Sequence, residues 1–209
     1  MALRHLYLHG FASGPSSKKG LAFAAHFAAR GITIERLDLN VPSFEHLRLS
    51  AMIETTRAAI GGPDDRAILI GSSLGGLTAA RVAERDPRVT SLVLLAPAFQ
   101  LISRWRQLPG WDDWERTGWR EVTDYTTNQP ARVDIDFARD AEAIDIGFPD
   151  VRVPTLIFHG LHDDVVPIAY SREFAATRPH VRLVELDDTH ELIATLEGTL
   201  STCDSFISA

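Results

Sequence analysis

The chain has 209 residues, 45% hydrophobic and 23% charged, a balance typical of a soluble globular protein. Its formal net charge of −7 argues against a nucleic-acid or anionic-membrane partner, because phosphate groups select basic surfaces. The only cysteine, Cys203, excludes an internal disulfide bond, and no signal peptide or membrane-spanning run is evident. We therefore expect a cytoplasmic protein whose residues 1–209 form a single domain.

Short apolar runs alternate along the chain with amphipathic stretches. The predicted strands are residues 5–10, 32–39, 66–71, 91–97, 153–160 and 181–188. The predicted helices are residues 16–31, with Ser16 or Ser17 as N-cap, then 44–62, 74–85, 168–177 and 191–207. This alternation predicts right-handed βαβ units and a parallel sheet with helices on both faces.

One segment, from about residue 99 to about residue 150, contains no buried strand and interrupts this alternation. A polar hairpin is predicted at 120–135 and a short helix at 136–145. A structureless insertion of this length would be unusual, so we expect an inserted cap with its own structure. Four tryptophans fall in the cap and either fasten it to the body or line a substrate pocket: Trp105, Trp111, Trp114 and Trp119.

The stretch Gly71–Gly75, "GSSLG", matches the pattern G-x-S-x-G between a predicted strand and a predicted helix. In that setting the pattern predicts a nucleophile elbow, a tight turn that holds a serine hydroxyl above the sheet edge. Ser73 is the candidate rather than Ser72, because Ser73 has glycine both two residues before and two residues after it. An ordinary helix N-cap is the alternative role for this serine.

A serine hydroxyl is a useful nucleophile only when a base takes its proton and a third group orients that base. Two carboxylates, Asp163 and Asp164, follow the fifth predicted strand, and His190 follows the sixth. Open α/β sheets place their sites at this carboxyl edge. The chain order serine, acid, histidine is the order expected for this architecture.

The acid stretch also contains four possible metal ligands: His159, His162, Asp163 and Asp164. However, His159 would lie at a buried strand end, and no second ligand cluster follows. We therefore expect no metal at this stretch.

The only two lysines, Lys18 and Lys19, lie in the first turn of a predicted helix, where cations oppose the helix dipole. They either attract an acidic group of a substrate or are solvated or paired with carboxylates.

These motifs together resemble the α/β-hydrolase superfamily and, among its members, the small YqiA-like bacterial esterases. "YLHGFASGP" is similar to that family's His-Gly loop, "GSSLGG" to its elbow, "HGLHDDVVP" to its acid loop and "DDTHEL" to its histidine loop. In the acid loop the acid stands three residues after the glycine, which implies Asp163, three after Gly160. The resemblance covers nearly the whole chain. It implies a three-layer α/β-hydrolase fold with an inserted cap and a minimal six-stranded parallel sheet of order 2-1-3-4-5-6.

The expected strand order places the first and third strands side by side, which would bring the Gly10-Phe11 turn beside the Ser73 elbow. Backbone N–H groups of Phe11 and Leu74 would then form an oxyanion hole. His9, at the end of its strand, is expected to hold this loop through hydrogen bonds.

The resemblance thus implies a cofactor-independent serine hydrolase, a carboxylesterase for small or medium acyl esters, that acts through Ser73, His190 and Asp163. Thioesterase or amidase activity would use the same groups. A non-catalytic small-molecule-binding protein of the same fold is the alternative outside the enzyme class. The sequence does not indicate the oligomeric state.

Overall fold

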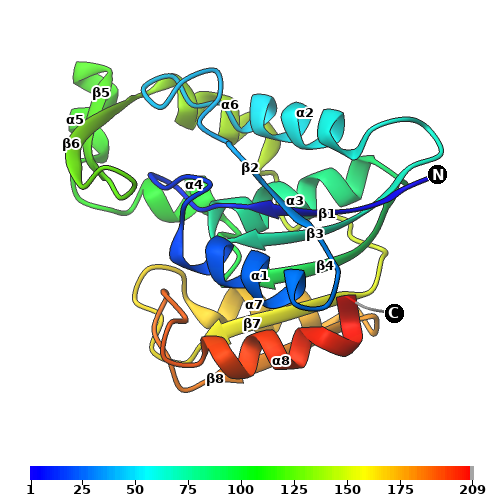
Figure 1. Cartoon of the computed structure of the whole chain (residues 1–209). Helices are drawn as coiled ribbons and strands as arrows, with labels where there is room; N and C mark the ends of the chain where they lie inside the picture. Colours follow the sequence, from blue (N-terminus) through cyan, green and yellow to red (C-terminus); the bar gives the residue numbers. More distant parts are fainter. Residues whose placement is uncertain (208–209) are drawn as a thin grey trace.

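The computed structural model describes residues 1–207, which are built around six parallel strands in the order β2-β1-β3-β4-β7-β8 (Figure 1). These strands are β1 (Leu3–Leu8), β2 (Ile34–Leu37), β3 (Arg66–Ser72), β4 (Val89–Leu95), β7 (Thr155–Gly160) and β8 (Val181–Leu186). The predicted sheet and its strand order are therefore confirmed. A separate antiparallel pair consists of β5 (Trp119–Asp124) and β6 (Gln129–Asp134).

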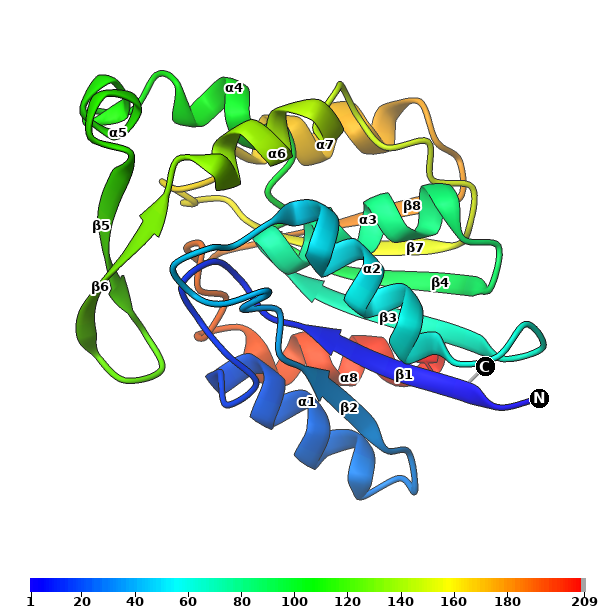
Figure 2. The same cartoon turned by 90° about the horizontal axis from the view of Figure 1, so that it is seen from above.

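Helices cover both faces of the sheet and give the predicted three layers (Figures 1 and 2). On one face lie α1 (Lys18–Ala28) and α8 (Leu196–Ile207), and on the other lie α2 (Leu49–Ile60), α3 (Leu74–Arg85) and α7 (Ile168–Ala176). Successive strand residues point to opposite layers. In β1, for example, Leu6 and Leu8 belong to the core under α2 and α3, whereas Tyr7 packs with Phe23 and Phe27 of α1.

Two helix starts differ from the sequence prediction. The second helix begins at Leu49 rather than residue 44, and α8 begins at Leu196 rather than residue 191. Before α8, the Asp188 carboxylate accepts hydrogen bonds from the backbone of Thr189 and from both the backbone and the hydroxyl of Thr195. Residues 189–195 therefore form a turn that Asp188 stabilises, where the sequence predicted the start of the helix. This turn contains His190.

The cap contains more regular structure than the sequence predicted. The hairpin β5–β6 and the short helix α6 (Asp136–Ile144) are confirmed, and two further short helices precede them, α4 (Leu101–Trp105) and α5 (Trp111–Thr117). Figure 2 shows the hairpin beyond the carboxyl ends of the strands, away from both termini. Its turn rests on the loop after β1, because the Tyr125 amide donates to the Ala12 carbonyl at 2.8 Å.

The base of the hairpin is fixed by an ion pair to the body. Arg48 at the start of α2 donates to the Asp134 carboxylate at 2.7 Å, and the Asp134 amide donates to the Glu45 carbonyl. The hairpin is thus held at both ends above the carboxyl edge of the sheet. No helix within residues 1–207 combines the length and apolar character required to cross a membrane.

Candidate active site

The Ser73 elbow joins β3 directly to α3 and has strained backbone geometry. Ser73 has φ 53° and ψ −115°, values that cost a non-glycine residue roughly 1–3 kcal/mol. Neighbouring backbone leaves no room for side chains beside it. A Cβ on Gly71 would overlap the Gly75 carbonyl, and one on Gly75 would overlap the carbonyls of Leu8 and His9. These glycines let the strand, the turn and the helix approach closely enough to hold the serine in this conformation.

The hydroxyl of Ser73 is not used as a helix cap. No hydrogen bond runs from its side chain to the first turn of α3. Instead, Ser73 Oγ lies 3.0 Å from Nε2 of His190, and Nδ1 of His190 lies 2.8 Å from Oδ2 of Asp163. The structure therefore brings together the three residues that the sequence singled out, in a chain of two hydrogen bonds.

The Asp163 side chain is fully buried and well supplied with hydrogen-bond donors. Burial alone would raise its pKa, but hydrogen bonds from His159, His190 and the Val166 amide hold the pKa of this carboxyl well below its usual value. Its Oδ1 also accepts from the Val165 amide. Asp163 is thus a stable anion. The neighbouring Asp164 takes no part in the hydrogen bonds that join Ser73, His190 and Asp163.

The role of His159 is not evident from the sequence. Its Nε2 lies 3.1 Å from Asp163 Oδ2 and 2.8 Å from the Val166 carbonyl, and Ser171 lies 2.8 Å from its Nδ1. The only sequence signal is a histidine at the end of an apolar strand. His162, the other histidine of this loop, instead pairs with Asp187 at the surface.

Lys19 holds the loop that carries the histidine. Its ammonium group donates at 2.9 Å to the carbonyl of Glu191, the residue after His190. Burial lowers the pKa of Lys19, against the opposing effect of the carboxylates of Glu191, Asp163 and Asp188. This hydrogen bond to a backbone carbonyl is none of the roles expected from the sequence, which were attraction of an acidic substrate group, solvation, or pairing with a carboxylate.

The loop after β1 lies against the elbow, as the strand order predicted. A Cβ on Gly10 would come within 3.4 Å of Ser73 Cβ. Within residues 1–207, the amides of Phe11 and Leu74 donate to no protein acceptor, so both remain free for a ligand. His9 fixes the loop because its Nδ1 donates to the Gly10 carbonyl and its Nε2 accepts from the Leu39 amide, each at 2.9 Å.

The four cap tryptophans lie in different surroundings. Trp111 and Trp114 are 8% and 1% exposed, and the Trp114 indole donates to the Val133 carbonyl. Trp105 packs edge-on against Phe11, with ring centroids 5.0 Å apart. Trp119 lies beneath the Arg132 guanidinium. Their part in substrate binding stays a prediction, which the contact with Phe11 supports best for Trp105.

A cavity of about 690 Å³ lies in the cap, outside the hydrogen-bonded chain of Ser73, His190 and Asp163. Helix α5 and the hairpin supply its lining, which includes Trp114, Arg116, Trp119, Arg120 and Arg132. The cavity therefore belongs to the cap, and Ser73 does not line it.

Comparison with known proteins identifies both a family and a fold. The family model described as "Uncharacterised protein family (UPF0227)" matches residues 4–207, and no curated protein matches the sequence. The solved structure of mouse alpha/beta hydrolase domain-containing protein 10 is 21% identical, with a TM-score of 0.81 over 99% of this chain and 89% of that chain.

Two structures of esterases are also similar. Est1E from Butyrivibrio proteoclasticus, solved with ferulic acid bound, is 21% identical, with a TM-score of 0.82 over 99% of this chain and 88% of that chain. The Pyrococcus furiosus esterase Pf2001 is 17% identical, with a TM-score of 0.69 over 99% and 80%. At these identities the likeness shows a shared α/β-hydrolase fold.

Proposed function

This chain belongs to the Uncharacterised protein family (UPF0227) within the α/β-hydrolase superfamily, and from its site geometry we propose that it is a serine hydrolase for carboxylic esters. The observation that carries the proposal is the hydrogen-bond chain from Ser73 through His190 to Asp163, at 3.0 and 2.8 Å. The names of similar structures, several of which are esterases, agree with it.

In the proposed reaction, Ser73 Oγ attacks the ester carbonyl carbon while His190 Nε2 accepts the serine proton. The carbonyl oxygen becomes an oxyanion that the amides of Phe11 and Leu74 stabilise, and losing one such donor typically costs about 3 kcal/mol of transition-state stabilisation. The tetrahedral intermediate collapses, His190 protonates the leaving alkoxide, and an acyl-enzyme remains on Ser73.

Deacylation repeats these steps with water as the nucleophile. His190 takes a proton from water, hydroxide oxygen bonds to the acyl carbon, and the proton returns to Ser73 Oγ as the acid leaves. Asp163 holds the His190 tautomer whose Nε2 can accept a proton, and it stabilises the imidazolium that forms. No cofactor enters this scheme, in which the substrate is a small or medium acyl ester.

A fluorophosphonate labelling experiment tests the proposal. Folded wild-type protein is expected to gain one adduct, located by mass spectrometry at Ser73, and Ser73→Ala protein none. Wild-type protein is also expected to hydrolyse p-nitrophenyl esters at least about a thousand-fold faster than Ser73→Ala protein. A folded wild-type protein that forms no adduct would favour the alternative, a non-catalytic small-molecule-binding protein. Acyl-CoA thioesters and p-nitroanilides in the same assay separate thioesterase and amidase activity from esterase activity.

A further inference from the structure

Arg120 differs from the other arginines in the hydrogen bonding and ion pairing of its guanidinium group. It is the only arginine within residues 1–207 that is not exposed and whose side chain makes no hydrogen bond or ion pair with protein atoms. Its Nη1 atom is buried without an acceptor. Burial lowers the pKa of Arg120, and no neighbouring carboxylate opposes that effect. A guanidinium carries five N–H donors, and leaving one buried and unpaired is costly.

Aromatic rings hold this guanidinium in place. Its Cζ lies 5.7 Å from the Trp105 ring centroid and 5.6 Å from that of Trp114. A cation–π contact of this kind stabilises the charge of a guanidinium but does not pair the N–H donors at its edge. The side chain is therefore fixed in position while part of its hydrogen-bonding capacity stays unused.

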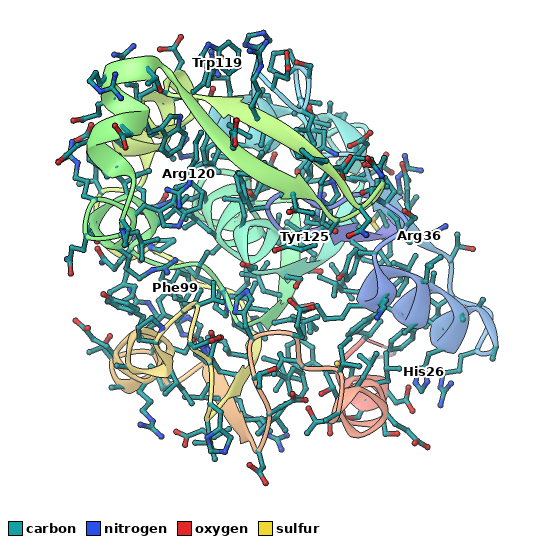
Figure 3. All side chains as sticks on the ribbon, turned by 90° about the vertical axis from the view of Figure 1, so that its left-hand side faces the viewer. His26, Arg36, Phe99, Trp119, Arg120 and Tyr125 are labelled. Atoms are coloured by element: carbon teal, nitrogen blue, oxygen red, sulfur yellow. The ribbon has the colours of Figure 1, made fainter. Side chains whose placement is uncertain are left out.

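Arg120 lies on the inward face of the hairpin, where its side chain is half-buried. In β5 it stands opposite Val133 of β6, which is 0% exposed, so the two share the inward face of the hairpin. Figure 3 shows Trp119 and Arg120 on opposite sides of the hairpin, with Arg120 on the side toward Phe99. Trp105, beneath Arg120, packs against Phe11 of the loop beside Ser73.

Space for a ligand group borders the same residue. Arg120 lines the cap cavity of about 690 Å³, together with Arg116 and Arg132. Those two arginines are already paired, Arg116 with Asp113 at 2.7 Å and Arg132 with Glu45 at 3.0 Å. Asp113 and Glu121 also line the cavity, but among its three arginines, within residues 1–207, Arg120 is the one that makes no ion pair.

We propose that Arg120 binds an oxyanion, a carboxylate or phosphate, at the end of the substrate remote from the scissile ester, so that the preferred substrates are acidic esters. This inference rests on the proposed function and adds a substrate class to it. The ester carbonyl lies at Ser73, the connecting part of the substrate passes the rings of Phe11 and Trp105, and the anion takes the free guanidinium edge. Charge-assisted bonds of this kind are stronger and more directional than neutral ones.

Matched pairs of esters test this assignment. One pair is 4-carboxyphenyl butanoate and its neutral amide, 4-carbamoylphenyl butanoate, which place the charge on the alcohol side. A second pair is the monophenyl ester of adipic acid and its terminal amide, which place the charge on the acyl side. 4-Phosphonooxyphenyl butanoate distinguishes phosphate from carboxylate. Wild-type protein is expected to prefer at least one acidic ester over its neutral partner by about 10- to 100-fold in kcat/KM.

Substitutions assign the preference to one residue. Arg120→Gln is expected to abolish the preference, measured as the ratio of kcat/KM for an acidic ester to that for its neutral partner, and Arg120→Lys is expected to restore it in part. Arg116→Gln is the matched control from the same cavity and should keep the preference. Thermal unfolding of each variant verifies folding. An Arg120→Gln protein that keeps the full preference would overturn the assignment, and so would a wild type with no preference for any acidic ester.

A binding measurement separates failure of this inference from failure of the proposed function. Tryptophan fluorescence of Ser73→Ala protein, titrated with each ester pair, reports affinity without turnover. Tighter binding of an acidic ester, lost in the Ser73→Ala, Arg120→Gln double variant, supports the oxyanion site even where no ester is hydrolysed. If the protein hydrolyses neutral esters but binds both members of every pair with equal affinity, the proposed serine hydrolase function stands and the oxyanion site is rejected.

Discussion

The Nε2 atom of His159 lies 3.1 Å from Oδ2 of Asp163, the same carboxylate oxygen that lies 2.8 Å from His190. Because the Val166 carbonyl can only accept, the His159 Nε2 facing it carries the proton. His159 is fully buried and its hydrogen-bond partners are Ser171 and Val166 rather than Ser73, so we expect it to influence the proposed reaction only by positioning Asp163.

Replacing His159 with leucine removes a donor from a buried carboxylate. We expect His159→Leu to lower the free energy of unfolding by about 1–3 kcal/mol and kcat by about tenfold, with little change in KM. Steady-state kinetics on a p-nitrophenyl ester and urea unfolding measure the two effects. His159→Gln, which keeps an N–H donor, should recover part of both. Unchanged kcat in a folded leucine variant would exclude the positioning role.

The strained backbone at Ser73 predicts a difference between two inactive variants. Ser73→Gly and Ser73→Ala both remove the hydroxyl and should abolish ester hydrolysis. Glycine adopts the observed φ of 53° with little strain, whereas alanine does not. We expect the glycine variant to be the more stable by about 1 kcal/mol in urea unfolding. Equal stabilities would mean that the elbow relaxes when the hydroxyl is lost.

Gly75 is predicted to tolerate no side chain, because a Cβ there would overlap the backbone carbonyls of Leu8 and His9. Gly75→Ala should destabilise the fold by about 1–3 kcal/mol and displace the elbow, with a large loss of kcat. Gly198→Ala in α8 is the control, since nothing lies within 4 Å of its Cβ position. That variant should be more stable by roughly 0.5–1 kcal/mol, with unchanged kinetics. Chemical unfolding and an ester assay test both variants.

Cys203 is predicted to be unreactive while the protein is folded. It is 0% exposed, and burial, with the nearby charge of Asp204, raises the pKa of its thiol to about 12. At pH 8 only about one thiol in ten thousand is therefore ionised, and the thiolate is the reactive form. Ellman's reagent should modify Cys203 in denaturant but not in buffer at pH 8. Rapid reaction of the folded protein would contradict this prediction.

The same pKa shift has a consequence for stability. The folded state holds the thiol proton more tightly than the unfolded chain does. The protonated thiol's contribution to the free energy of unfolding is therefore complete at pH values below the ordinary thiol pKa, near 8.5. It is lost as the pH rises from there toward 12. Cys203→Ser should therefore show a smaller decline in Tm between pH 8 and pH 10 than wild-type protein does.

The sequence predicted the sheet because its strands are apolar runs with clear boundaries, and motif order then placed Ser73, Asp163 and His190 on one edge. It did not predict α4 and α5, because helices of five and seven residues are too short to show a helical period. The late start of α8 depends on Asp188 and Thr195, whose contact forms only in the folded chain. The cation–π contacts of Arg120 with Trp105 and Trp114 likewise join residues that no local pattern connects.

The two outer strands of the sheet have features that disfavour edge-to-edge association with other copies of the chain. Strand β2 is only four residues long and exposes Glu35, and β8 exposes Arg182 and Glu185 at its opposite border. Pairing a strand from another copy with either edge would desolvate these charges, and on the β2 side only four residues are available for pairing. Within residues 1–207 no further strand covers either border of the sheet, and we expect these features to disfavour edge-to-edge polymerisation.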